Sequence, residues 1–198
     1  LVDSQSGTIT FAGRRIDQLK GPALQHLRRD IQFIFQDPYA SLDPRLTVGF
    51  SIMEPLLVHN VMRGREAEQR VAWLLERVGL LEMANRSAGN LAYGQQRRLE
   101  IARAMCTAPE MICLDEPAAG LNPVETATLS RIIRFLRQHH GITVLLIEHD
   151  MGMVMEISDR VIVLDHGDVI ARGTPQEIQH NEAVIAAYLG ADEEELAG

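Results

Sequence analysis

The sequence MICLDEP, residues 111–117, decides the fold class. Four apolar residues run into two acids, which predicts a buried strand with Asp115 and Glu116 at its carboxyl end. Ligands of open α/β sheets bind at that end of the strands. There, one carboxylate can hold Mg²⁺ while its neighbour polarises the water that attacks a γ-phosphate, a Walker B arrangement with a candidate base. The same acids can instead cap a following helix, and this segment alone leaves both interpretations open.

Helix-like and strand-like segments alternate around this strand, which predicts a parallel α/β sheet. The expected helices are residues 95–106, 123–139 and 151–157, and the expected strands are 111–114 and 143–147. A turn at Gly167, between residues 160–164 and 168–171, predicts an added antiparallel hairpin. Upstream, two strand-like segments, 8–11 and 31–35, flank a helical insert at 23–29.

Spacing and punctuation divide the chain into four expected parts. Apolar residues recur at intervals of three and four within residues 66–78, which predicts a helix of a small helical subdomain. The parts are the end of an N-terminal β region (1–36), a loop with the helical subdomain (37–94), an α/β core (95–190) and a frayed acidic tail (191–198).

Composition excludes several classes of protein. The 198 residues are 46% hydrophobic and 23% charged, which rules out disordered and fibrous chains. A net charge of -8 without a long basic cluster argues against a nucleic-acid partner. The two cysteines lack the paired spacing of a zinc site, and no apolar run approaches the ~20 residues of a membrane span. A reducing cytoplasm is expected.

A second candidate segment, LAYGQQRR, covers residues 91–98. Gly94 lets the backbone approach a ligand closely, and the start of the following helix favours an anion such as phosphate. Taken by itself, the segment is better explained as an ordinary loop leading into a helix. Three further residues stand at element ends: Gln36 after residues 33–35, Asn122 in GLNP, and His149 after residues 144–148. Taken singly, they read as a strand-end amide, a helix cap and a surface histidine.

The order of these five motifs resembles that of the ABC-transporter ATPases, whose signature is LSGGQ. The resemblance implies a P-loop NTPase-like ABC ATPase core with a helical subdomain, working on ATP and Mg²⁺. Asp115 is then expected to hold Mg²⁺ and Glu116 to polarise the attacking water. Gln36 is expected to contact Mg²⁺ and that water, and His149 to contact the γ-phosphate.

The resemblance also implies a head-to-tail dimer with a second ABC ATPase subunit. Ala92, Tyr93, Gly94 and Gln95 are expected to close on ATP held by the opposite subunit, and Asn122 to bridge the seam. The dimer is expected to work with transmembrane permease subunits as a peripheral protein on the cytoplasmic face of the inner membrane. A solute-binding protein takes part only indirectly.

One motif of the family is missing from the sequence. G-x-x-x-x-G-K-[S/T], the loop that cradles the β- and γ-phosphates, occurs nowhere in the 198 residues. We therefore expect an N-terminally truncated chain, lacking the first strands and this loop and inactive alone. A non-catalytic partner that donates only its signature to another chain's ATP is the alternative. The presence of Asp115, Glu116 and His149 favours the truncated ATPase.

Two branches of the family are represented along the chain. FIFQDPYASLDPR, residues 33–45, makes residues 1–80 similar to importers of dipeptides, oligopeptides and glutathione. LAYGQQRRLEIAR, DEPAAGLNP and IEHDM make residues 84–190 similar to importers of branched-chain amino acids. The expected function is ATP hydrolysis coupled to uptake of peptides or amino acids, with the two branches joined near residues 79–90.

Overall fold

A parallel three-stranded sheet forms the centre of the fold. The computed structural model describes residues 6–36 and 41–189. Strands β3 (Ile31–Ile34), β4 (Met111–Asp115) and β5 (Thr143–Ile147) pair in the order β3-β4-β5. The register aligns Ile34 with Leu114 and Leu114 with Leu146, so the three strands end within one residue of one another. The expected α/β fold with a parallel sheet is confirmed, while the acidic tail at 191–198 lies outside the described residues.

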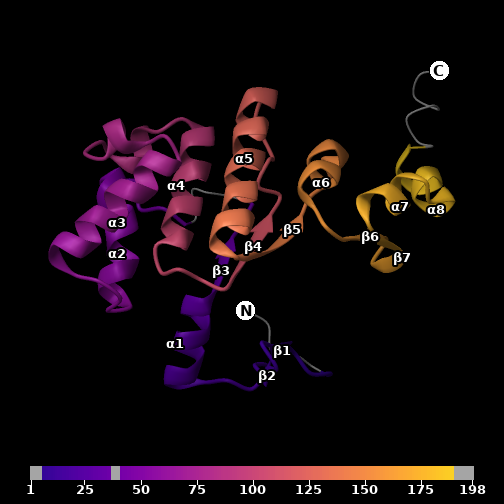
Figure 1. Ribbon diagram of the computed structural model, residues 1–198, viewed down its shortest axis with the longest axis horizontal. Helices are drawn as coiled ribbons and strands as arrows, with labels where there is room; N and C mark the ends of the chain where they lie inside the picture. The colour runs from indigo at the N-terminus through magenta and orange to yellow at the C-terminus, as the bar shows by residue number, and fades with distance from the viewer. Residues whose placement is uncertain (1–5, 37–40, 190–198) are drawn as a thin grey trace.

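Helices cover one face of this sheet (Figure 1). They are α4 (Tyr93–Met105), α5 (Pro123–His140) and α6 (Met151–Ile157). Alternate strand residues point to opposite faces, and Ile112 and Leu114 of β4 are buried at 0% and 2% exposure in the main core. Asn122 caps the start of α5, and Gly141 ends it in a left-handed conformation with φ 62°.

The opposite face of the sheet is apolar and uncovered by the described residues. Phe33, Cys113 and Leu145 are neighbours across the three strands. Phe33 is 59% exposed and Leu145 is 50% exposed. Ile147 follows on the same face at 57% exposure. Parallel sheets are ordinarily buried on both faces. In the described part of the chain, no element packs on this face.

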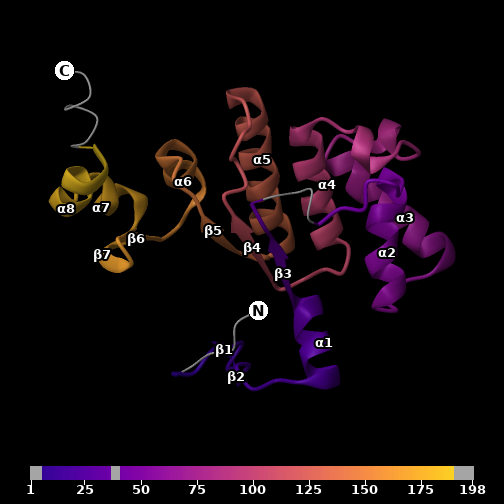
Figure 2. The same cartoon turned by 180° about the vertical axis from the view of Figure 1, so that it is seen from behind.

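The helical subdomain stands at one end of the molecule (Figures 1 and 2). Helices α2 (Val48–Val58) and α3 (Gly64–Arg77) pack on each other and on α4. The expected helix at 66–78 is confirmed as α3, and its residues Leu74 and Leu75 are buried. Helix α2 runs through Pro55 because Thr47 caps its start and Ile52 and Leu56 are fully buried. Short 3₁₀ turns, Leu81–Met83 and Ala88–Asn90, lead to α4.

The remaining elements flank the core. A hairpin of two short strands, β1 (Thr10–Phe11) and β2 (Arg14–Arg15), precedes α1 (Gly21–Asp30). The strand expected at residues 8–11 is therefore shorter than predicted. Strands β6 (Val161–Asp165) and β7 (Asp168–Gly173) form the expected antiparallel hairpin. They are followed by α7 (Pro175–Gln179), α8 (Glu182–Val184) and the π-helical turn Ile185–Leu189. Among the helices of the described residues, none combines the length and apolar character needed to cross a bilayer.

Truncating an apolar side chain is expected to lower the free energy of unfolding by different amounts on the two faces of the sheet. Leu114→Ala removes a side chain from a residue that is 2% exposed and is expected to lower the free energy of unfolding by ~2–5 kcal/mol. Leu145→Ala, at a residue that is 50% exposed, is expected to cost less than ~1 kcal/mol. Urea denaturation of the 198-residue chain measures both. Equal losses would show that the outer face is packed.

Candidate functional site

The three predicted catalytic residues meet at the carboxyl edge of the sheet. Gln36 follows β3, Glu116 follows β4, and His149 follows β5 by two residues. The Gln36 side-chain amide Nε2 donates a hydrogen bond to Glu116 Oε2 at 2.7 Å. His149 Nδ1 lies 3.8 Å from the same oxygen. Parallel strands of equal extent place the residues after them together, which explains how groups 80 residues apart come into contact.

The backbone at Glu116 is left-handed, with φ 42°. A non-glycine residue pays for this conformation, and such strain is concentrated at functional sites. The strained turn is held because Glu116 N–H donates to Ile147 O of β5 at 2.9 Å, and Ala119 N–H donates to Glu116 O at 3.1 Å. The carboxylate is therefore directed out of the sheet edge, with its side chain 32% exposed.

Glu148, which the sequence analysis did not single out, fixes the loops around this site. Its side chain is 1% exposed. One carboxylate oxygen accepts the Ala118 N–H at 2.8 Å, and the other accepts those of His149 at 3.0 Å and Asp150 at 3.3 Å. The side chain thus ties the loop after β4 to the loop after β5. The exposed imidazole of His149 is positioned by this anchor next to Glu116.

Oxygen donors suited to Mg²⁺ gather at the same edge. Asp115 ends β4 opposite Ile147, half-buried, and Glu116 and Gln36 follow at adjacent strand ends. In the described part of the chain, no group of three or more acidic, histidine or cysteine residues could hold a metal ion by itself. Mg²⁺ is ordinarily bound by one or two carboxylates together with substrate phosphates and water. The donor set fits a Mg²⁺ ion that arrives with a nucleotide.

The predicted signature residues lie at the start of α4. Ala92 is the N-cap, and its N–H donates to the Gln95 side-chain oxygen at 3.0 Å. Tyr93 is the one of the four that reaches Gln36 in the described contacts: its hydroxyl donates to Gln36 O at 3.5 Å. In those contacts Ala92, Gly94 and Gln95 reach neither Gln36 nor Glu116.

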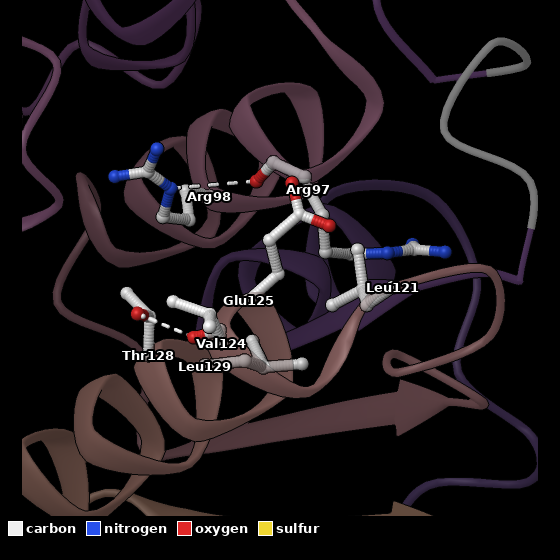
Figure 3. A pocket seen from close by; sticks show the side chains of 8 residues that line it. Arg97, Arg98, Leu121, Val124, Glu125, Thr128 and Leu129 are labelled. Atoms are coloured by element: carbon white, nitrogen blue, oxygen red, sulfur yellow. Dashed lines mark hydrogen bonds between the residues drawn. The ribbon is translucent and has the colours of Figure 1, made fainter.

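Gly94 leaves room for the Glu125 side chain between α4 and α5. A Cβ at this position would lie 2.5 Å from Glu125 Oε1, so the glycine admits the carboxylate of this chain. Glu125 in turn accepts the Asn122 N–H at 3.1 Å, and the Asn122 side chain accepts the Val124 and Glu125 N–H groups. Asn122 is thus a helix cap in this structure. A cavity of about 180 Å³ opens beside this contact, with Arg98 and Thr128 on its wall (Figure 3).

A profile of the ABC transporter family matches residues 1–119. The chain belongs to the ABC transporter family. A second profile, described as the branched-chain amino acid ATP-binding cassette transporter, matches residues 169–194. The resemblance drawn from the ordered motifs is therefore confirmed, and the second match agrees with the branch assigned to the C-terminal half.

Curated relatives come from both predicted branches. The glutathione import ATP-binding protein GsiA of Pectobacterium atrosepticum is 55% identical over 179 residues, 90% of this chain but 29% of that protein. The high-affinity branched-chain amino acid transport ATP-binding protein LivG of Salmonella typhimurium is 48% identical, over 93% of this chain and 76% of that protein. Because both align along almost the whole chain, neither alignment locates the join expected near residues 79–90.

Solved ABC structures share the fold. The cbiO1 protein from Clostridium perfringens, part of the transporter complex cbiONQ, superposes with a TM-score of 0.81 at 29% identity, covering 94% of this chain and 73% of that chain. The ATP-binding cassette MJ0796, dimeric and bound to ADP and Pi, superposes with a TM-score of 0.76 at 28% identity, covering 86% and 74%. The predicted ABC ATPase core is confirmed.

The anchoring role of Glu148 predicts a specific loss of stability. Glu148→Ala leaves three backbone N–H groups without their carboxylate acceptor and is expected to cost ~1.5–3 kcal/mol of unfolding free energy. The control is Glu156→Ala, which removes an ion pair with Arg134 from a side chain that is 48% exposed and is expected to cost ~1 kcal/mol or less. Urea denaturation compares the two. Similar values for both variants would contradict the anchoring role.

Proposed function

We propose that this chain is the ATP-binding and ATP-hydrolysing subunit of an ABC importer that takes up glutathione, other peptides or amino acids. The observation that carries the proposal is the contact of Gln36 and His149 with one carboxylate, Glu116, at the carboxyl edge of the sheet. The names of the relatives, a glutathione import protein and a branched-chain amino acid transport protein, supply the substrate classes.

Each side chain has a defined part in the proposed hydrolysis. Glu116 accepts a hydrogen bond from the attacking water and polarises it, and the Gln36 amide orients that water. The His149 imidazole donates to the γ-phosphate as negative charge develops there. Asp115 holds Mg²⁺, which neutralises charge on the phosphates when bound. In the structure Gln36 already donates to Glu116 at 2.7 Å, so the carboxylate is held in place before substrate binds.

A phosphate loop has to be added to complete the site, because the 198 residues contain no G-x-x-x-x-G-K-[S/T]. It comes either from a further segment of the same polypeptide or from another chain. The cluster around Glu116 favours the first source, since a subunit that donated only its signature would have no use for a water-polarising carboxylate. The non-catalytic partner is the second candidate function.

The proposed assembly is a head-to-tail dimer on transmembrane permease subunits at the cytoplasmic face of the membrane. Residues 92–95 and Asn122 face ATP bound by the second subunit. A dimer is supported by the MJ0796 structure, which is dimeric with ADP and Pi. The four parts, 1–36, 37–94, 95–190 and 191–198, remain the proposed division of the chain.

Hydrolysis is tested by joining residue 1 to a segment that carries a phosphate loop, taken from the LivG relative. The joined protein is expected to hydrolyse MgATP. Glu116→Gln is expected to lower kcat by about 10²–10⁴-fold, the usual contribution of a positioned base, while ATP still binds. Glu156→Gln, at an exposed side chain of α6 that pairs with Arg134 of α5, serves as the control and keeps full activity. Hydrolysis that survives Glu116→Gln would exclude this carboxylate as the base.

Choice of permease is a separate prediction. The resemblance implies that the family docks its membrane subunit at the segment after Gln36, and residues 33–45 resemble the peptide-importer type. The chain is therefore expected to co-purify with a permease of the peptide class when both classes are co-expressed with it. Co-purification with a branched-chain amino acid permease alone would contradict this assignment.

A further inference from the structure

Arg97 is buried completely although it carries a charge. Its residue exposure is 0%, and Glu100, one helical turn later, is also buried, at 4%. Removing a guanidinium from water costs several kcal/mol unless good hydrogen bonds replace its hydration. The contacts of Arg97 therefore show what the fold gains by placing the charge there.

The Arg97 guanidinium holds the two peptide carbonyls that follow the last residue of β3. Nη1 donates to Phe35 O at 2.6 Å and to Glu100 Oε2 at 2.9 Å. Nη2 donates to Gln36 O and to the Tyr93 hydroxyl. One planar fork thus grips two successive carbonyls, which a lysine ammonium cannot do in the same geometry.

Glu100 completes the arrangement on the other side of residues 37–40. It accepts hydrogen bonds from Arg97 and from the Ser41 hydroxyl. Arg103, a further turn along α4, donates to Ser41 O. Helix α4 therefore holds the chain both directly before and directly after this segment. Burial raises the pKa of Glu100, and the hydrogen bond from Ser41 and the charge of Arg97 oppose that shift.

We propose that Arg97 is a positioning residue for hydrolysis: by gripping the Phe35 and Gln36 carbonyls it holds the Gln36 side chain on Glu116. The chain of contacts runs from the guanidinium to the Gln36 backbone and from the Gln36 amide to Glu116 Oε2 at 2.7 Å. Arg97 itself touches neither Glu116 nor a reacting atom in the described contacts. The inference deepens the proposed function and rests on it for the link to catalysis.

Wild-type protein provides the first test, which carries no risk of misfolding. In NMR spectra of the ¹⁵N-labelled chain, the Arg97 guanidinium is expected to show separate, slowly exchanging Nη–H signals, because both Nη1 and Nη2 donate to acceptors. Exposed Arg14 supplies the averaged reference signal. The Gln36 side-chain amide is expected to show one proton shifted downfield by its bond to Glu116. Averaged Arg97 signals would overturn the proposal.

The second test replaces the fork while keeping the charge. In Arg97→Lys the downfield shift of the Gln36 side-chain proton is expected to collapse, with exchange about tenfold faster, as loss of a charge-assisted hydrogen bond implies. Arg98→Lys is the matched control, because the Arg98 guanidinium instead reaches Val78 O at 2.7 Å and Gly94 O at 3.4 Å. A folded Arg97→Lys chain with an unchanged Gln36 signal would refute the proposal, as would equal changes in both variants.

A double variant covers the case in which Arg97→Lys fails to fold. Arg97→Met with Glu100→Gln removes both buried charges together and avoids leaving Glu100 unpaired. The same loss of the Gln36 shift is expected. None of these measurements uses nucleotide, so they remain decisive if the hydrolysis experiment fails.

The effect of Arg97 on catalysis is measured in the protein that has been joined to a phosphate-loop segment and hydrolyses MgATP. Arg97→Lys is expected to lower kcat about tenfold with KM nearly unchanged, because it disturbs the alignment of water and not the binding of ATP. A changed Gln36 signal with unchanged kcat would show that Arg97 holds the Phe35 and Gln36 carbonyls without serving the reaction, which would overturn its role as a positioning residue.

Discussion

The parallel pairing of β3, β4 and β5 is the constraint on which the rest of the structure depends. Its register aligns Ile34, Leu114 and Leu146, so the residues that follow the three strands emerge at one edge. A slip of one residue would turn each apolar side chain to the opposite face and move the polar strand ends apart. Burial of Ile112 and Leu114 against α4 and α5 opposes such a slip. Packing of the covered face thereby sets the geometry at Glu116.

Elements with an uninterrupted local signal could be predicted from the sequence, and elements stabilised by distant packing could not. Strand β5 follows from the continuous apolar run at residues 143–147, and α5 from Asn122 and Pro123 at its start. Helix α2 was not predicted because Gly49 and Pro55 suggest breaks. Burial of its apolar side against α3 and α4 outweighs the hydrogen bond that Pro55 cannot donate.

The candidate site divides in the same way. Gln36 and His149 were expected at the site because the order of motifs resembles that of the ABC ATPases, and Glu116 also because it follows a buried strand; strand ends in a parallel sheet meet. Glu148 and Arg97 could not be predicted, because in the sequence they are an acid beside other polar residues and a base in a QQRR segment. Their roles come from being 1% and 0% exposed with backbone groups as partners. Burial of a charge is a tertiary property that local spacing does not encode.

The left-handed backbone of Glu116 shows why strain alone does not mark a functional site. Ala12, Asn60, Ala108 and His166 also have positive φ values, and none of them carries the contacts of this site. At Glu116 the conformation costs of order 1–3 kcal/mol, which glycine would largely avoid. Glycine has no carboxylate to receive the Gln36 amide at 2.7 Å or to lie 3.8 Å from His149. The strain persists because hydrogen bonds from Glu116 N–H to Ile147 O and from Ala119 N–H to Glu116 O hold the turn at the sheet edge.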